Sequence, residues 1–181
     1  MELFAERGYG EVTVDEIARR AGLTKRSFFN HFTDKREVLF ADAREFEADI
    51  IRYLSEAAPG LPPVEAAICA LTRAGQDLAR YGANAARFRR DLIASSTELQ
   101  ERNLIKMAAL TSAIASALRG PGTPARTAAF AAHAAVTVFG AAYDEWADDA
   151  TADFAALMRR ALSDMSQAVS PDDRSSPAFT G

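Results

Sequence analysis

Residues 13–40 have the sequence TVDEIARRAGLTKRSFFNHFTDKREVLF, which predicts two short helices joined by a tight turn and followed by a longer helix. Thr13 and Glu16 form an S/T-x-x-E capping box, the usual start of a helix. Gly22 can end that helix, because glycine adopts the left-handed cap conformation at little cost. Thr24 is the expected N-cap of the second helix. This layout is the helix-turn-helix, whose second helix enters the major groove of DNA.

Basic residues gather in this segment although the whole chain has a net charge of −4. Six basic residues oppose a single acid, Asp34, between residues 17 and 36: Arg19, Arg20, Lys25, Arg26, Lys35 and Arg36. Because salt screens charges beyond about 10 Å, a local basic patch is sufficient for phosphate binding on an acidic protein. A solvated charged face is the alternative interpretation of the same residues.

The segment from Leu3 to Leu39, about a quarter of the chain, resembles the DNA-binding domain of the tetracycline-repressor-like (TetR) transcriptional regulators. The positions that carry the resemblance are Leu3-Phe4, Gly8-Tyr9, Thr13-Val14, Ile17-Ala18, Ala21-Gly22-Leu23-Thr24, His31-Phe32, Lys35 and Leu39. The resemblance implies a homodimer that binds double-stranded DNA at a palindromic operator, usually as a repressor, and that responds to a small-molecule effector.

The candidate DNA-binding residues lie in and around the second helix of the motif. They are Thr13, Thr24, Lys25, Arg26, Ser27, Phe29, Asn30, His31 and Lys35. Arg26 is the best candidate for reading a base, because its planar fork can pair with O6 and N7 of guanine. By resemblance, His31 lies on the DNA side and Lys35 binds a phosphate. Phe29 stands where the family often has tyrosine, so it offers packing or a contact with a thymine methyl group.

The remaining chain predicts an all-α fold of about nine helices, with no strand candidate. The first helix covers about residues 2–7. Later helices are expected at residues 35–55, 63–81, 85–94, from the Ser95/Glu98 capping box to Leu118, from Thr123-Pro124 to Trp146, and at 151–169. We expect a DNA-binding domain at residues 1–45, an effector-binding and dimerisation bundle at residues 46–169, and a disordered tail at residues 170–181.

Two sets of apolar residues are candidates for contacts with an effector and with a second copy of the chain. The pocket candidates, which core packing explains equally well, are Phe46, Ile50, Tyr53, Leu71, Phe88, Leu92, Met107 and Leu110. The dimer-interface candidates on the last two helices are Phe130, Ala134, Val138, Phe154, Leu157, Met158, Ala161 and Leu162. The apolar character of the first set favours a hydrophobic effector, and no cofactor or metal is expected.

Composition and motifs argue against secretion, membrane insertion and catalysis. Cys69 is the single cysteine, which rules out an internal disulfide and indicates a reducing compartment. The longest apolar stretch, residues 128–143, is shorter than the roughly 20 residues of a membrane span, so a cytoplasmic protein is expected. The sequence contains no known catalytic motif. His133 is expected in the core or in an interface. The acids of residues 144–149 are expected at a solvated helix end. The alternative function is a helical ligand-binding or scaffolding protein without DNA binding, which Phe29 favours.

Overall fold

The computed structural model describes residues 2–149 and 151–170, and these residues fold into nine α-helices and two short 3-10 helices. The elements are α1 Glu2–Arg7, α2 Val14–Arg20, α3 Lys25–His31, η1 Lys35–Phe40, α4 Ala43–Ser55, α5 Pro63–Leu78, η2 Ala79–Tyr81, α6 Ala83–Ala94, α7 Thr97–Leu118, α8 Ala125–Asp148 and α9 Phe154–Val169. The all-α prediction is confirmed. The tail predicted to be disordered lies outside the described residues from 171 onward.

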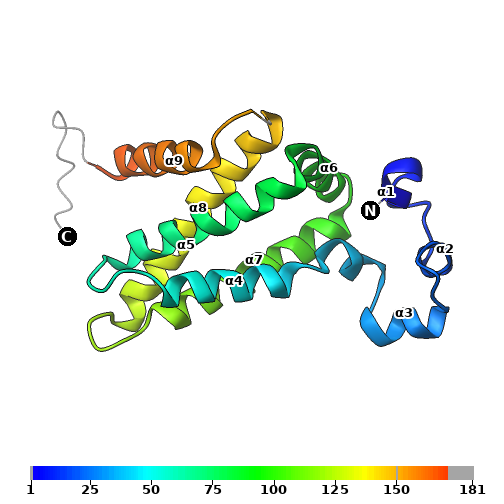
Figure 1. The fold of residues 1–181 in the computed structure, drawn as a ribbon, viewed down its shortest axis with the longest axis horizontal. Coiled ribbons are helices and arrows are strands. Elements are labelled where there is room, and N and C mark those ends of the chain that lie inside the picture. The colour runs from blue at the N-terminus through cyan, green and yellow to red at the C-terminus, as the bar shows by residue number, and fades with distance from the viewer. Residues whose placement is uncertain (1, 150, 171–181) are drawn as a thin grey trace, which may run out of the picture.

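The molecule is elongated, with α1–α3 at one end and a helical bundle at the other (Figure 1). We call α1 through η1 the head and α4 through α9 the body. Within the body, α4, α5, α7 and α8 pack side by side, and α9 lies against α8 and α5. None of the described helices combines the length and the apolar character needed to cross a lipid bilayer.

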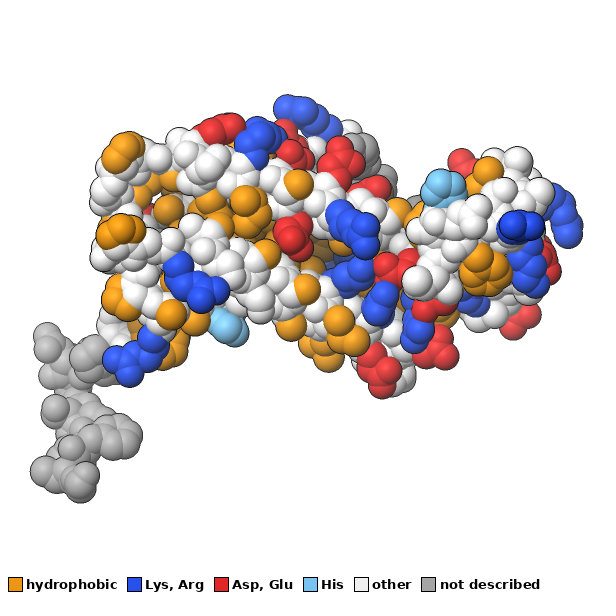
Figure 2. All heavy atoms as spheres, turned by 90° about the horizontal axis from the view of Figure 1, so that it is seen from below, with side chains coloured by type: hydrophobic (Ala, Val, Ile, Leu, Met, Phe, Trp, Pro, Cys, Tyr) orange, Lys and Arg blue, Asp and Glu red, His pale blue; other side chains and the backbone are white. Residues whose placement is uncertain are grey.

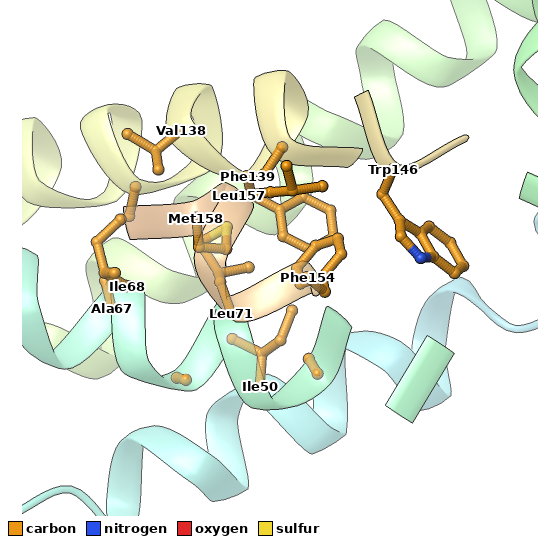
Figure 3. Close-up of a cluster of buried hydrophobic side chains, with 14 of the residues drawn as sticks. Ile50, Ala67, Ile68, Leu71, Val138, Phe139, Trp146, Phe154, Leu157 and Met158 are labelled. Carbon is orange, nitrogen blue, oxygen red and sulfur yellow. The ribbon is translucent and has the colours of Figure 1, made fainter. Parts of the chain in front are cut away.

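The body is held together by an apolar core in which small and aromatic side chains interlock (Figure 3). Ile50, Leu71 and Met158 are fully or almost fully buried there. Gly75 on α5 lets the Phe154 ring of α9 approach closely, because a Cβ at residue 75 would lie 2.0 Å from a ring carbon. The close contact of α5 with α9 therefore depends on a glycine at this position.

A second apolar cluster joins the head to the body. Leu39 and Phe40 of η1 are buried in it against Leu92 of α6 and Leu99 of α7. The other buried members come from the first part of the head: Phe4, Tyr9 and Val12. The C-terminal end of α6 and the N-terminal end of α7 therefore share a core with the head rather than with the rest of the body.

The predicted single helix over residues 35–55 is wrong in its first part. Residues 35–40 form the 3-10 helix η1, Ala41 and Asp42 make a turn, and α4 begins at Ala43. The tighter 3-10 winding suits short connecting pieces. Here it buries both Leu39 and Phe40 in the cluster between head and body, so tertiary packing overrides the helical periodicity.

Two predicted helix starts are also displaced. The capping box of Ser95 and Glu98 does not form, because the Ser95 hydroxyl donates to the Leu92 carbonyl at 2.7 Å and completes α6 instead. The last helix starts at Phe154 rather than near Thr151, because the Asp153 side chain accepts a hydrogen bond from the Ala155 N–H at 3.1 Å.

Candidate nucleic-acid interface

Local hydrogen bonds fix the two helices of the motif as the sequence predicts. The Glu16 carboxylate accepts from the Thr13 N–H at 2.8 Å, while the Thr13 hydroxyl oxygen accepts from the Glu16 N–H at 3.3 Å. Gly22 follows α2 with a φ of 68°, a left-handed conformation that glycine adopts without strain. Thr24 caps α3 by accepting from the Ser27 N–H at 3.0 Å.

One side of α3 is anchored in the head and the other faces solvent. Phe28 is 1% exposed and packs against Phe32 at 5.2 Å between ring centroids. Phe29 is 49% exposed. Other exposed side chains of this helix are Lys25, Arg26, Asn30 and His31. The structure therefore exposes five of the nine predicted contact residues on α3, while Phe28 anchors the other side of this helix.

Most basic side chains of the head are already paired with acids of the same chain, and Figure 2 shows both kinds of charge on this end of the molecule. The pairs are Lys25 with Asp15 (3.3 Å), Arg20 with Glu2 (3.2 Å) and Glu6 (2.9 Å), Arg36 with Asp34 (2.5 Å), and Arg7 with Glu16. Among the described residues, Arg19 and Arg26 form no ion pair. These two guanidinium groups are the basic groups of the head that are most readily available to DNA.

Lys35 has a structural position that the sequence did not indicate. Its ammonium group donates to the carbonyls of Tyr9 at 2.7 Å and Val12 at 2.9 Å, and lies 4.1 Å from the centre of the Tyr9 ring. Lys35 thus ties η1 to the loop between α1 and α2. An ammonium carries one more N–H than these two carbonyls use, which leaves one donor for a phosphate.

The Glu16 carboxylate is strongly stabilised in its ionised form. Hydrogen bonds from the backbone N–H and the hydroxyl of Thr13, together with one from Arg7, lower the pKa of Glu16 from 4.5 to about 2. The capping box is therefore fully charged at neutral pH and holds the start of α2.

The predicted pocket residues fall into two separate groups. Ile50, Tyr53, Leu71 and Leu110 are buried in the body core. Phe46 and Met107 are partly buried against the same core. In contrast, Phe88 and Leu92 belong to the cluster between head and body. A pocket formed by all eight residues is therefore not present in this structure.

A hollow of about 320 Å³ lies over part of the first group, between α4 and the end of α5. Phe46, Tyr53 and Leu78 contribute apolar surface to it, and the Tyr53 hydroxyl donates to Asp77 within it. Its other lining residues are Asp42, Glu45, Asp49, Arg52, Ala74 and Arg80.

The predicted interface residues also divide between core and surface. Val138, Phe154, Leu157 and Met158 are buried within the single chain. Ala134, Ala161 and Leu162 are half-buried. Phe130 is 70% exposed. Periodicity identified the apolar stripe on α9 correctly, but that stripe faces α5 and α8 of the same chain.

The acids near the end of α8 bind the arginines of neighbouring helices. Arg90 of α6 pairs with Asp148 at 2.7 Å, and Arg160 of α9 pairs with Glu145. His133 was expected in the core or in an interface, and its exposed position excludes only the core; its ring Nδ1 lies 2.8 Å from the Ala129 carbonyl oxygen. Within residues 2–149 and 151–170, no group of His, Cys, Asp and Glu side chains is arranged to hold a metal ion.

Sequence reasoning missed Glu37 as a link between head and body. Its carboxylate binds Arg102 and Lys106 of α7, the latter at 3.0 Å. The spacing of Arg102 and Lys106 by four residues places two cations on one helix face, and that was the signal available in the sequence.

Comparison with known families accounts for both parts of this architecture. A model of the bacterial regulatory proteins of the tetR family matches residues 1–41. The MftR C-terminal domain model matches residues 61–170, which is more than half of the chain. The chain belongs to the TetR family of bacterial regulatory proteins. The TetR helix-turn-helix is thus joined here to a body of the MftR type.

Two curated relatives are similar over short segments. The TetC protein of transposon Tn10 from Escherichia coli is 46% identical over 39 residues, or 22% of this chain and 20% of that protein. The putative mycofactocin biosynthesis transcriptional regulator MftR of Mycobacterium tuberculosis is 40% identical over 42 residues, which are 23% of this chain and 21% of that protein. The likeness thus spans about a fifth of each relative.

The TetR fold is also supported by a solved structure that is similar along its whole length. Thermus thermophilus FadR, described as a TetR-family transcriptional repressor in complex with lauroyl-CoA, is 24% identical with a TM-score of 0.51. The match covers 100% of this chain and 95% of FadR. This likeness concerns the fold.

Proposed function

We propose that this chain is a repressor that binds a palindromic operator as a homodimer and leaves it when a small hydrophobic effector binds. The observation that carries the proposal is the exposed first turn of α3, where Arg26 has no ion-pair partner among the described residues. The helix dipole disfavours cations at a helix N-terminus, so basic residues here support a role outside the fold. From this position Arg26 can pair with guanine in the major groove.

Specific binding to an operator needs two heads held at a fixed distance, because one helix-turn-helix contacts few bases. Homodimers of this kind place recognition helices about 34–36 Å apart, one turn of DNA. The exposed side of α8 supports an interface there, since Phe130 is 70% exposed and the neighbouring Ala134 and Thr137 are small enough for close helix approach.

A hydrophobic effector is supported by the apolar core beneath the hollow between α4 and α5. Entry there would separate Phe46 and Tyr53 from the core and act on α4, the first helix of the body. Lauroyl-CoA, bound in the FadR structure, is the first ligand to test. Four acids and two arginines line the hollow, and this net negative charge disfavours phosphate groups there. Coenzyme A alone should therefore not release the DNA and serves as the control.

The proposal is tested by selecting DNA from a random-sequence pool with the full chain, with and without lauroyl-CoA. The expected result is an enriched pair of inverted half-sites about 10 base pairs apart, centre to centre. Effector binding should release this DNA. A chain that enriches no sequence, yet binds the ligand, would be the helical ligand-binding protein without DNA binding.

A further inference from the structure

The connection between head and body is interrupted where a rigid helix was expected. The 3-10 helix η1 ends at Phe40 and α4 starts at Ala43, with a turn between them. An unbroken helix would carry the head as a fixed extension of the body. With the break present, side-chain contacts of η1 must set the orientation of the head.

On one face, η1 is joined to α7 by Glu37. The Glu37 side chain is 17% exposed, and its two oxygens are used separately: Oε1 by Arg102 and Oε2 by Lys106, the latter at 3.0 Å. The partners are 65 and 69 residues away in sequence. Asp34 caps η1 without help, accepting from the Arg36 N–H at 2.8 Å and the Glu37 N–H at 3.2 Å. The Glu37 carboxylate is therefore not required for the local cap.

Apolar contacts hold the other face of η1. Leu39 and Phe40 are buried against Leu92 and Leu99, and the Arg89 guanidinium lies 5.1 Å from the centre of the Phe40 ring. Apolar packing is non-directional, so it keeps η1 close to the body without fixing its rotation. Two hydrogen-bonded cations on separate oxygens of one carboxylate do restrict rotation.

We propose that Glu37 is a positioning residue for DNA binding, whose contacts with Arg102 and Lys106 fix the angle between head and body and thereby the spacing of the two heads. This inference rests on the proposed function. Lys35 completes the arrangement, because it ties the same short helix to the Tyr9 and Val12 carbonyls of the head. Thus Lys35 bonds η1 to the rest of the head, and Glu37 bonds it to the body.

The test compares the wild-type chain with E37Q on three DNAs: the selected operator, the same operator with one base pair added between its half-sites, and a single half-site. The wild-type chain should prefer the original spacing. In E37Q this preference should fall by about fivefold, the size expected for a partly exposed ion pair. Single half-site affinity should not change, because α3 is untouched.

Two variants serve as controls for E37Q. E101Q removes the same charge from α7, where Glu101 is exposed and forms no ion pair within the described residues, and it should keep the wild-type spacing preference. The charge-swapped variant E37K/R102E/K106E should recover the spacing preference, because it restores one charge held between two opposite charges.

A second measurement needs no DNA. Spin labels on Cys69, which is exposed on α5, and on an A5C variant of α1 report the distance from head to body within one chain. The labelled chains are diluted with unlabelled chains so that only distances within a chain are seen. The distance distribution should be narrow in the wild-type background and broader in E37Q.

Different results overturn different statements. An unchanged spacing preference and an unchanged distance distribution in E37Q would overturn the positioning role. Loss of single half-site binding in E37Q would also overturn it, because Glu37 would then act on the fold of the head. A wild-type chain that binds the operator no better than a half-site would overturn the dimeric function itself, and the spacing role with it.

Discussion

Arg26 combines the properties that a base-reading side chain needs: exposure, a place in the first turn of α3, and no ion pair among the described residues. The R26A variant should lose about 1–3 kcal/mol on the selected operator and lose base preference at one position per half-site. Competition titrations with single-base operator variants measure both effects. R119A, which removes the same charge from an exposed residue directly after α7, is the matched control. An unchanged specificity profile for R26A would assign Arg26 to phosphate or solvent.

Lys35 should contribute to the stability of the head as well as to DNA binding. K35M keeps most of the stem but removes both hydrogen bonds to the Tyr9 and Val12 carbonyls. The free energy of unfolding should fall by about 1.5–3 kcal/mol, since the bonds come from a charged donor. K25M, at an exposed position with one long ion pair, should change it by less than about 0.5 kcal/mol. Equal urea midpoints for K35M and wild type would contradict the structural role.

Because of Glu16, the stability of the head should decrease as the pH falls below about 4.5. Its pKa is about 2 in the folded chain and 4.5 without its hydrogen bonds, so the unfolded chain binds more protons between these values. The stabilisation is complete above pH 4.5 and is lost as the pH falls through about 2. Urea unfolding followed from neutral pH to pH 2 should show a steeper loss for wild type than for E16Q. Parallel curves would mean that the carboxylate gains nothing from folding.

At the scale of helices, the packing of α5 against α9 depends on Gly75. In G75A the new Cβ would lie 2.0 Å from the Phe154 ring, which is buried and cannot move freely. Overpacking of this kind costs about 1–3 kcal/mol. G140A is the matched control, because nothing lies within 4 Å of its new Cβ and alanine favours a helix by about 0.5–1 kcal/mol over glycine. Thermal unfolding should therefore separate the two variants in opposite directions.

Helix starts and stops were predictable where they depend on residues within a few positions. Thr13, Gly22 and Thr24 act as predicted, because each cap is a contact between near neighbours. The break after Phe40 was not predictable, because it depends on Leu92 and Leu99 far along the chain. Tertiary contacts of this kind leave no local signal in a single sequence.

For the candidate site, the sequence shows where basic residues gather but not which of them are already bound within the chain. Sequence placed Arg26 and Lys35 in the same basic patch, yet the structure leaves the first exposed and binds the second to backbone carbonyls. Likewise, the spacing of apolar residues on α9 predicted an apolar face but not whether the same chain or a second copy covers it. Phe154 and Leu157 are covered by their own chain.

At the scale of the whole molecule, two single substitutions distinguish the proposed dimer interface from the core of one chain. F130E places a charge at a side chain that is 70% exposed, so it should give folded monomers. L157E buries a charge at a position that is 5% exposed and should unfold the body. Light scattering reports the mass and circular dichroism the helix content. A folded dimer of F130E would place the interface elsewhere.

The dependence of operator binding on salt tests the central claim most directly, because only a dimer that binds the DNA backbone through its heads releases many counterions. About four phosphate contacts per subunit give about eight per dimer. The logarithm of the association constant for DNA should then fall with the logarithm of the salt concentration with a slope of roughly −7. Fluorescence anisotropy of the selected operator, titrated at several salt concentrations, measures this slope. A value near roughly −7 is predicted, and a slope shallower than about −3 would contradict DNA binding by the paired heads.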